Sequence, residues 1–126
     1  MSSQLIHTCY RIVDVDRSVA FYGALGFEEL RRMSLPDGAT NVFMGLPGDG
    51  ARLELTYNPG TERYDIGTGY GHIAVTTADL DGALAGLAEQ GITPEREPYT
   101  VSDGGSRICF VRDPDDYRIE LIEARS

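Results

Sequence analysis

The sequence predicts an α+β fold made of two βαβββ modules, each forming a half-barrel, and three observations support this prediction. The two halves of the chain repeat, because a histidine, two aspartates and a glycine recur with identical spacing. Short runs alternate apolar with polar residues, as strands with one buried face do. One stretch in each half instead has apolar residues at helical spacing. The repeated positions are His7, Asp14, Asp16 and Gly26 in the first half and His72, Asp79, Asp81 and Gly91 in the second. Two copies of one unit account for all three observations.

The first module spans about residues 5–57. Asp14 and Asp16 can cap the N-terminus of its helix, and Gly26 can end that helix. The sequence LPGDG supplies a turn before the last strand. The expected strands lie near residues 5–13, 28–34, 40–45 and 51–57, with the helix near 16–25.

The second module spans about residues 70–123 and follows the same plan, with DPDDY as the turn before its last strand. Its expected strands lie near residues 71–77, 94–100, 106–112 and 117–123, with the helix near 79–90. The segment 58–69, NPGTERYDIGTG, is rich in turn formers and is expected to be a linker within a single domain, 1–126. A sheet with a helix on one face leaves its other face open, so two such sheets can curl around a shared cavity.

Composition is typical of one globular domain, with 126 residues of which 41% are hydrophobic. The net charge of −9 argues against nucleic acid or an anionic membrane as a partner. No apolar run is long enough to span a bilayer, and residues 2–4 lead straight into the first strand, so we expect no secretory signal and a cytoplasmic location. Cys9 and Cys109 lie in apolar runs and are predicted to be buried thiols of a reducing compartment. All eleven basic residues are arginine, which excludes lysine Schiff-base chemistry.

Alternation along the strands gathers four candidate metal ligands on the faces opposite the helices. His7 shares a strand face with Cys9, while Glu54 and Glu120 alternate with large apolar residues. If those apolar residues pack on the helices, both carboxylates and both histidines, His7 and His72, converge on the concave side. Two imidazoles and two carboxylates suit Ni²⁺, Co²⁺ or Zn²⁺ with positions left for water. Taken singly, such a glutamate is more often a solvated strand residue and such a histidine an ordinary hydrogen-bonded one. Their recurrence in two copies favours the metal site.

Four segments resemble, in order, the signatures of the glyoxalase I family of the vicinal-oxygen-chelate superfamily. They are HTCYRIVDVDRSVAFYGALGF, LELTYN, GTGYGHIAV and DPDDYRIELIE, and the likeness runs from about Leu5 to Glu123. The resemblance implies that family's fold and one divalent metal per site, held by His7, Glu54, His72 and Glu120. The chain lacks the inserts of the longer zinc-dependent forms and is similar to the compact bacterial type. Ni²⁺ or Co²⁺ is therefore the expected metal, with Zn²⁺ as the alternative.

The resemblance also implies an activity, that of a lactoylglutathione lyase. Such an enzyme isomerises the hemithioacetal of methylglyoxal and glutathione to S-D-lactoylglutathione, which detoxifies methylglyoxal. Glu120 is assigned as the base, with Glu54 as its counterpart, although the sequence alone leaves the two roles exchangeable. Arg11 and Asn58 are expected to bind the γ-glutamyl carboxylate of glutathione, a surface ion pair being the alternative role for Arg11. Relatives pair their half-sheets between subunits, which implies a homodimer with active sites at the interface.

Two departures from the family pattern bear on these expectations. Asp116 stands where the family's turn carries glycine, which is tolerated at some cost if the turn needs a positive φ. Thr68 stands where some relatives carry a basic residue, which leaves the identity of the thiol open. The alternatives are a metalloenzyme of the superfamily acting on another thiol adduct, or a non-enzymatic member that binds a small molecule. A dioxygenase of the superfamily would show two histidines and one glutamate, and Glu54 argues against it.

Overall fold

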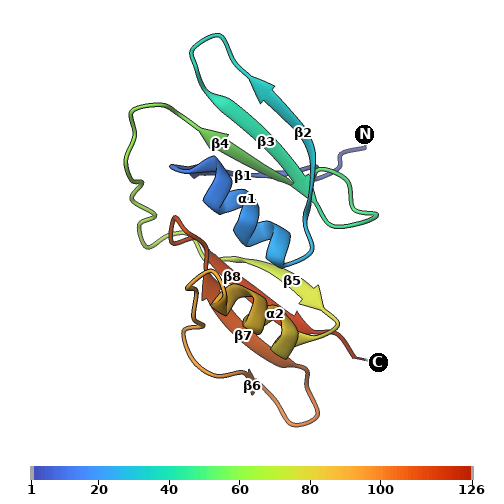
Figure 1. The fold of residues 1–126 in the computed structure, drawn as a ribbon. Coiled ribbons are helices and arrows are strands. Elements are labelled where there is room, and N and C mark those ends of the chain that lie inside the picture. Colours follow the sequence, from blue (N-terminus) through green and yellow to red (C-terminus); the bar gives the residue numbers. More distant parts are fainter. Residues whose placement is uncertain (1, 126) are drawn as a thin grey trace. The chain divides into compact units, whose positions relative to one another are not determined.

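The computed structural model describes residues 2–125, and the chain divides into two compact units, Met1–Tyr64 and Asp65–Ser126. Each unit contains one four-stranded sheet and one helix, in the order strand, helix, then three strands (Figure 1). The predicted α+β class and the two βαβββ modules are therefore confirmed. No helix in the described part of the chain has both the length and the apolar character needed to cross a membrane.

The first unit holds β1 (Thr8–Ile12), α1 (Val15–Ala24), β2 (Glu28–Ser34), β3 (Thr40–Gly45) and β4 (Leu53–Tyr57). The sheet order is β1-β4-β3-β2, with β1 parallel to β4 and the other pairs antiparallel. Helix α1 lies against one face of this sheet (Figure 1). It contributes Phe21 and Tyr22 to the core, together with alternate residues of the sheet. The edge strand β2 differs, because all seven of its residues are exposed and its register shifts between Glu29 and Arg31.

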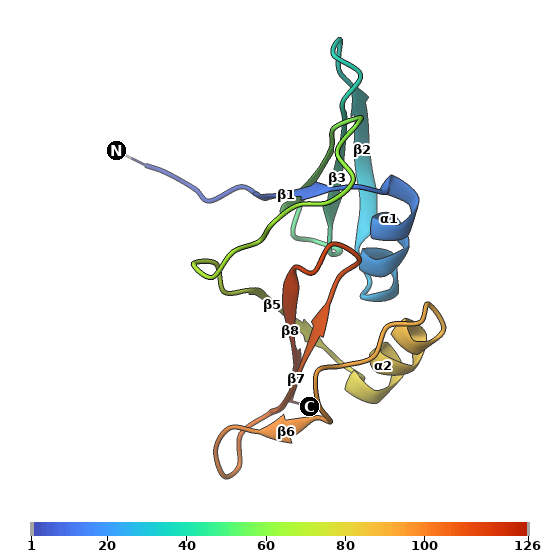
Figure 2. The same cartoon turned by 90° about the vertical axis from the view of Figure 1, so that its left-hand side faces the viewer.

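The second unit holds β5 (Ile73–Thr77), α2 (Leu80–Ala88), β6 (Tyr99–Thr100), β7 (Arg107–Arg112) and β8 (Arg118–Glu123). Its sheet order is β5-β8-β7-β6, which repeats the topology of the first unit. Helix α2 lies on one face of this sheet (Figure 2). Its residues Leu80 and Leu87 are buried. The opposite face of each sheet is left to carry polar side chains.

The helix ends follow the repeat found in the sequence. Asp14 and Asp79 are the N-caps, and each accepts a backbone N–H from the residue three positions on, at 3.0 and 2.9 Å. Gly26 and Gly91 have φ of 101° and 79°, which favours glycine, and the residue after each donates to a carbonyl five positions back at 3.0 Å. The capping roles predicted for these residues are confirmed.

Two strands differ most in length from the prediction. The first begins at Thr8 rather than at residue 5, so His7 lies directly before it. The strand expected at 94–100 is reduced to Tyr99–Thr100. Pro94 and Pro98 have no N–H to donate, which prevents continuous pairing with β7.

The turn before β8 does require a positive φ at the position where the family carries glycine. Asp116 has φ of 74° and is the one non-glycine residue between positions 2 and 125 with a positive φ. Asp113 holds this turn, because its Oδ1 accepts the backbone N–H groups of Asp115 and Tyr117, both at 2.9 Å. Aspartate thus occupies a conformation that costs L residues roughly 1–2 kcal/mol.

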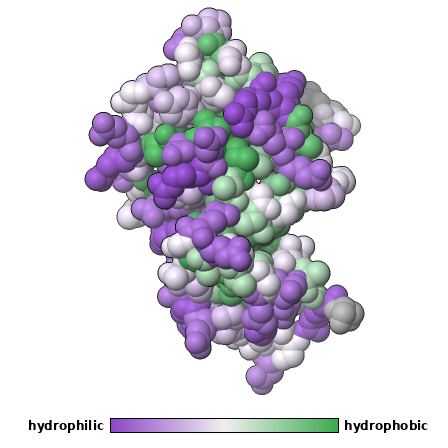
Figure 3. Space-filling view, viewed as in Figure 1, coloured by the Kyte–Doolittle hydropathy of each residue, from purple (hydrophilic) through white to green (hydrophobic). Residues whose placement is uncertain are grey.

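On the face seen in Figure 3, hydrophilic side chains predominate, with smaller apolar patches between them. One charge cluster in the second unit contributes to stability: Glu95 accepts two hydrogen bonds from Arg118 at 2.9 Å and lies 3.2 Å from Arg112. The hydrogen bonds from Arg118, followed by the charges of both guanidinium groups, lower the pKa of Glu95.

We expect Glu95→Gln to lower the free energy of unfolding at neutral pH by up to about 1 kcal/mol, the range of exposed ion pairs. Because the pKa of Glu95 is lower in the folded state, its contribution is present above the unfolded value of about 4.3 and is lost as pH falls further. Urea unfolding of both proteins at pH 7 and in acid checks this. Glu97→Gln, at an exposed site two residues on, is the control. A difference between Glu95→Gln and the unsubstituted protein that does not shrink in acid would contradict the assignment.

Candidate functional site

Each unit brings one of the predicted histidines together with one of the predicted glutamates. In the first unit His7 Nε2 lies 3.5 Å from Glu54 Oε2, and in the second His72 Nε2 lies 3.1 Å from Glu120 Oε1. The exposures match closely, with both histidine side chains 34% exposed and the glutamate side chains 17% and 18% exposed. The same nitrogen and oxygen pair is therefore built twice.

Strand alternation and parallel pairing create this geometry. Glu54 lies between Leu53 and Leu55, which are 1% and 0% exposed, so its carboxylate points away from the helix. Ile119 and Leu121, both 0% exposed, flank Glu120 in the same way. In each unit the histidine precedes the first strand, which pairs in parallel with the strand that carries the glutamate. The alternation inferred from the sequence is confirmed for both glutamates.

The donor chemistry of the two pairs fits a divalent metal ion. Imidazole nitrogen and carboxylate oxygen are ligands of Ni²⁺, Co²⁺ and Zn²⁺. Within residues 2–125 no group of three or more histidine, cysteine, aspartate or glutamate side chains is placed to hold an ion. Each pair therefore supplies two donors, which is half of the four-ligand set expected from the sequence.

The first pair has a further polar neighbour. Thr56 Oγ1 donates to Glu54 Oε1 at 3.2 Å and lies 3.4 Å from the sulfur of Cys9. Cys9 is exposed, so the prediction that it is buried is wrong: it lies on the open face of β1, whereas its neighbour Tyr10 faces the core. Partial burial of its sulfur raises the pKa of the Cys9 thiol, with Glu54 adding to this and the hydrogen bond with Thr56 opposing it. Cys109 is buried as predicted.

The two residues expected to bind the thiol lie at one end of the β1–β4 pair. Arg11 is an exposed residue of β1 opposite Thr56. Asn58 directly follows β4, and its Nδ2 donates to the hydroxyl of Tyr64 at 3.3 Å. Because β1 and β4 run in parallel, Arg11 and Asn58 lie toward the ends of these strands that are remote from His7.

Two phenylalanines that the sequence analysis did not single out contact the candidate ligands. Phe43 meets the ring of His7 edge to face, with 6.0 Å between centroids, and Phe110 meets His72 in the same way at 5.0 Å. In the ladders Phe43 pairs with Glu54, and Phe110 with Glu120. A signal was present, because both third strands carry a phenylalanine, but the spacing from the histidine differs by two residues (110 − 72 = 38 against 43 − 7 = 36).

The sequence analysis also missed one polar residue, Asn41. Asn41 lies on β3 opposite Thr56, and its Oδ1 is the one buried side-chain nitrogen or oxygen in the described chain without a hydrogen-bond partner. Its side-chain amide extends the line of residues that pair across the sheet, from Arg11 on β1 through Thr56 on β4 to Asn41 on β3.

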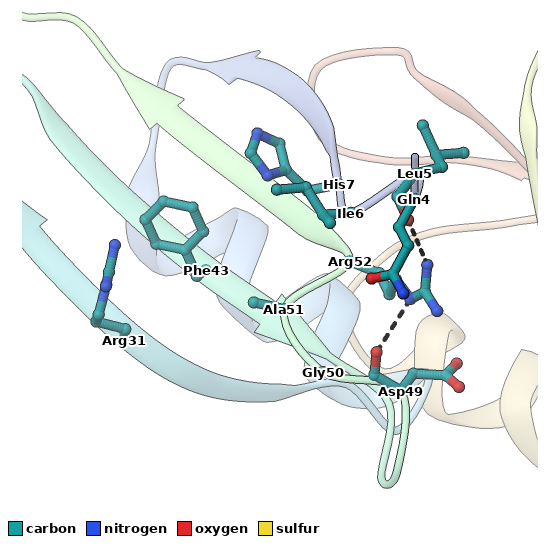
Figure 4. Close-up of a pocket in the computed structure, with 10 residues that line it drawn as sticks. All are labelled: Gln4, Leu5, Ile6, His7, Arg31, Phe43, Asp49, Gly50, Ala51 and Arg52. Atoms are coloured by element: carbon teal, nitrogen blue, oxygen red, sulfur yellow. Dashed lines mark hydrogen bonds between the residues drawn. The ribbon is translucent and has the colours of Figure 1, made fainter. Parts of the chain in front are cut away.

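A pocket of about 920 Å³ opens beside His7 in the first unit (Figure 4). Phe43 and Arg31 line one end, and the N-terminal segment 4–7 and the loop 49–52 line the other. Arg52 joins these two segments, because its guanidinium donates to the carbonyls of Leu5 at 2.6 Å and Asp49 at 3.0 Å. The candidate ligand His7 is thus accessible from a hollow large enough for a small molecule.

Comparison with known proteins identifies the family of the chain. Residues 4–121 match the model of the Glyoxalase/Bleomycin resistance protein/Dioxygenase superfamily. The chain belongs to this superfamily. Among its superfamily relatives, the lactoylglutathione lyase of Salmonella typhimurium is 41% identical over 126 residues, which cover 97% of this chain and 93% of that protein.

Plant relatives of the superfamily are longer. The lactoylglutathione lyase of Arabidopsis thaliana is 40% identical over 124 residues, which cover 95% of this chain but only 44% of the plant protein. The crystal structure of glyoxalase I from Zea mays superposes with a TM-score of 0.88 at 36% identity, covering 98% of this chain and 45% of the maize chain. This superfamily member therefore spans less than half the length of these plant proteins.

Proposed function

We propose that this chain is a metal-dependent glyoxalase I that isomerises the hemithioacetal of methylglyoxal and glutathione to S-D-lactoylglutathione. One observation carries the proposal: the histidine–glutamate pair occurs in both units, at 3.5 and 3.1 Å, in a chain similar over nearly its full length to a bacterial lactoylglutathione lyase. A non-enzymatic member of the superfamily would not need to retain both pairs.

His7, Glu54, His72 and Glu120 would hold one divalent ion, with Ni²⁺ or Co²⁺ preferred to Zn²⁺. When bound, the ion supplies Lewis-acid stabilisation of the negative charge that develops on the substrate oxygens. The donor set of two nitrogens and two oxygens supports this part of the proposal.

Glu120 is the residue that we assign to proton transfer, taking the proton from C1 of the substrate and returning it at C2. The surroundings of the two glutamates support this choice over Glu54. The hydroxyl of Thr56 donates to Glu54 Oε1 at 3.2 Å and so occupies one of the two acceptor oxygens of that carboxylate. Ile122 follows Glu120 at the equivalent position and offers no hydroxyl.

Arg11 and Asn58 bind the γ-glutamyl carboxylate of the thiol in this proposal, through charge-assisted and neutral hydrogen bonds respectively. Their place at one end of the β1–β4 pair, on the strands that carry Cys9 and Glu54, supports this role. Thr68, in place of a basic residue, favours a second candidate, in which the same isomerisation acts on the adduct of another thiol. Either thiol adduct fits a cytoplasmic enzyme.

A homodimer completes the proposed site. His7 and Glu54 of one subunit meet His72 and Glu120 of the partner subunit, and a two-fold axis makes two such sites. Each pair supplies two donors, half of the four-ligand set, which supports this arrangement.

We expect the apoprotein to regain turnover with Ni²⁺ or Co²⁺ and to regain less with Zn²⁺. The measurement is the ultraviolet absorbance of the thioester product, with the hemithioacetals of glutathione and of other thiols as substrates. Full activity with Zn²⁺ and none with Ni²⁺ would contradict the metal preference. Metal-loaded protein that turns over no hemithioacetal would contradict the proposed function.

A further inference from the structure

The same three-layer stack of arginine, phenylalanine and histidine occurs in both units. In the second unit the guanidinium carbon of Arg118 lies 3.7 Å from the centroid of the Phe110 ring, which in turn meets His72 edge to face at an interplanar angle of 81°. In the first unit Arg31 lies 4.8 Å from the Phe43 centroid (Figure 4), and Phe43 meets His7 at 77°. Both arginines are within the distance at which a cation is attracted to an aromatic face.

The two arginines are not equivalent positions of the repeat. Arg118 opens the motif RIELIE, and its counterpart in RLELTY is Arg52. Arg52 instead donates hydrogen bonds to the carbonyls of Leu5 and Asp49. In the first unit the arginine that lies over the phenylalanine is Arg31, from the edge strand β2. Duplication of the module therefore does not by itself explain the stack, because the arginine comes from β8 in the second unit and from β2 in the first.

We propose that Phe43 and Phe110 are positioning residues, which fix the imidazole rings of His7 and His72 with Nε2 toward the neighbouring carboxylate before metal binds. This inference rests on the proposed function, because it takes the two histidines as metal ligands. Arg31 and Arg118 hold the phenyl rings in turn.

Ring contact supplies a constraint that the strands do not. His7 and His72 precede β1 and β5, so the ladders do not fix their side chains, and each side chain is one-third exposed. An imidazole can turn about two bonds, and a turned ring presents the wrong atom to the metal. Edge-to-face packing restricts this rotation, so the histidine side chain loses less conformational entropy when metal binds.

The second stack is the more closely packed of the two. Its ring centroids are closer, at 5.0 against 6.0 Å, and its histidine is closer to its glutamate, at 3.1 against 3.5 Å. Arg118 is also held by two hydrogen bonds to Glu95 at 2.9 Å. We therefore expect substitution of Phe110 to have the larger effect.

The test compares Phe110→Leu and Phe43→Leu with the unsubstituted protein by competition for Co²⁺ against a chromophoric chelator. Phe110→Leu should weaken Co²⁺ binding by roughly 10-fold or more, within the 10–100-fold range of residues that orient ligand histidines. Phe43→Leu should have a smaller effect, and Phe110→Tyr, which keeps the ring, should retain most of the affinity.

The matched control is Phe27→Leu. Phe27 is 8% exposed, as Phe110 is, and its ring packs on Tyr22 rather than on a histidine. This variant should lose stability in urea without losing Co²⁺ affinity, which separates positioning from a general effect on folding.

A second measurement does not need metal. The chain has only two histidines, so the imidazole proton resonances of the apoprotein report each ring, and Phe110→Leu should remove the ring-current shift from His72 alone. Unchanged His72 resonances, or Co²⁺ affinity within about twofold of the parent, would overturn the inference while leaving the proposed function intact. Parent protein that binds no Co²⁺ would overturn the proposed function and the positioning role together.

Discussion

Glu120→Gln is expected to lower kcat by roughly 10²–10⁴-fold, the usual contribution of a positioned proton-transfer group, while metal content stays at the parent level. Glutamine keeps a carbonyl oxygen that can coordinate metal, but its amide cannot accept the proton from C1. Measuring metal stoichiometry beside kcat separates these two properties.

Glu54→Gln is the comparison for this experiment. Because Glu54 already accepts a hydrogen bond from Thr56, its replacement should reduce kcat less than that of Glu120. If Glu120→Gln binds metal fully and keeps a kcat near that of the parent, the roles are reversed and Glu54 is the base.

Mixing two inactive variants is expected to restore activity if the site is shared between subunits. His7→Ala and His72→Ala each remove a ligand, so each homodimer should lose metal and turnover together. Random exchange makes about half of the molecules heterodimers, each with one intact site of two, so the mixture should recover about a quarter of the parent activity.

The alternative arrangement predicts a different outcome. If each chain built its own site, every site in the mixture would still lack a histidine, and turnover would not return. Sedimentation must show that the mixture contains dimers, and a fully active monomer of the parent protein would also contradict a shared site.

Much of the fold could be predicted from local chemistry. Asp14 and Gly26 mark the two ends of a helix, and their counterparts 65 residues later do the same. A helix needs a side-chain acceptor at its N-cap, which Asp14 supplies, and a residue with positive φ just after its last turn, which Gly26 supplies. Alternation placed Glu54 correctly because leucines on both sides of it must be buried.

Other features depend on contacts that local patterns do not reveal. Cys9 lies in an apolar run, yet it is exposed, because only alternate residues of β1 face the core. The strand expected at 94–100 was predicted to be too long. The missing N–H groups of its prolines disrupt it only through pairing with β7, which the sequence does not reveal. Phe43 and Phe110 were missed because loops of unequal length hide their equivalence, which becomes visible through their pairing with Glu54 and Glu120.

The edge strands of the two sheets bear on how the protein avoids aggregation. Exposed edges invite pairing with other chains, and charge, irregular register, proline and short length all oppose this. Strand β2 is seven residues long and all of its residues are exposed, but it carries four charged side chains and a register shift, the charged residues being Glu28, Glu29, Arg31 and Arg32. Strand β6 is only two residues long and follows Pro98 directly. Arg31, which contacts Phe43, therefore also lies on the edge strand β2. Replacing the charged residues of this strand with uncharged ones would leave a longer strand edge with which another chain could pair.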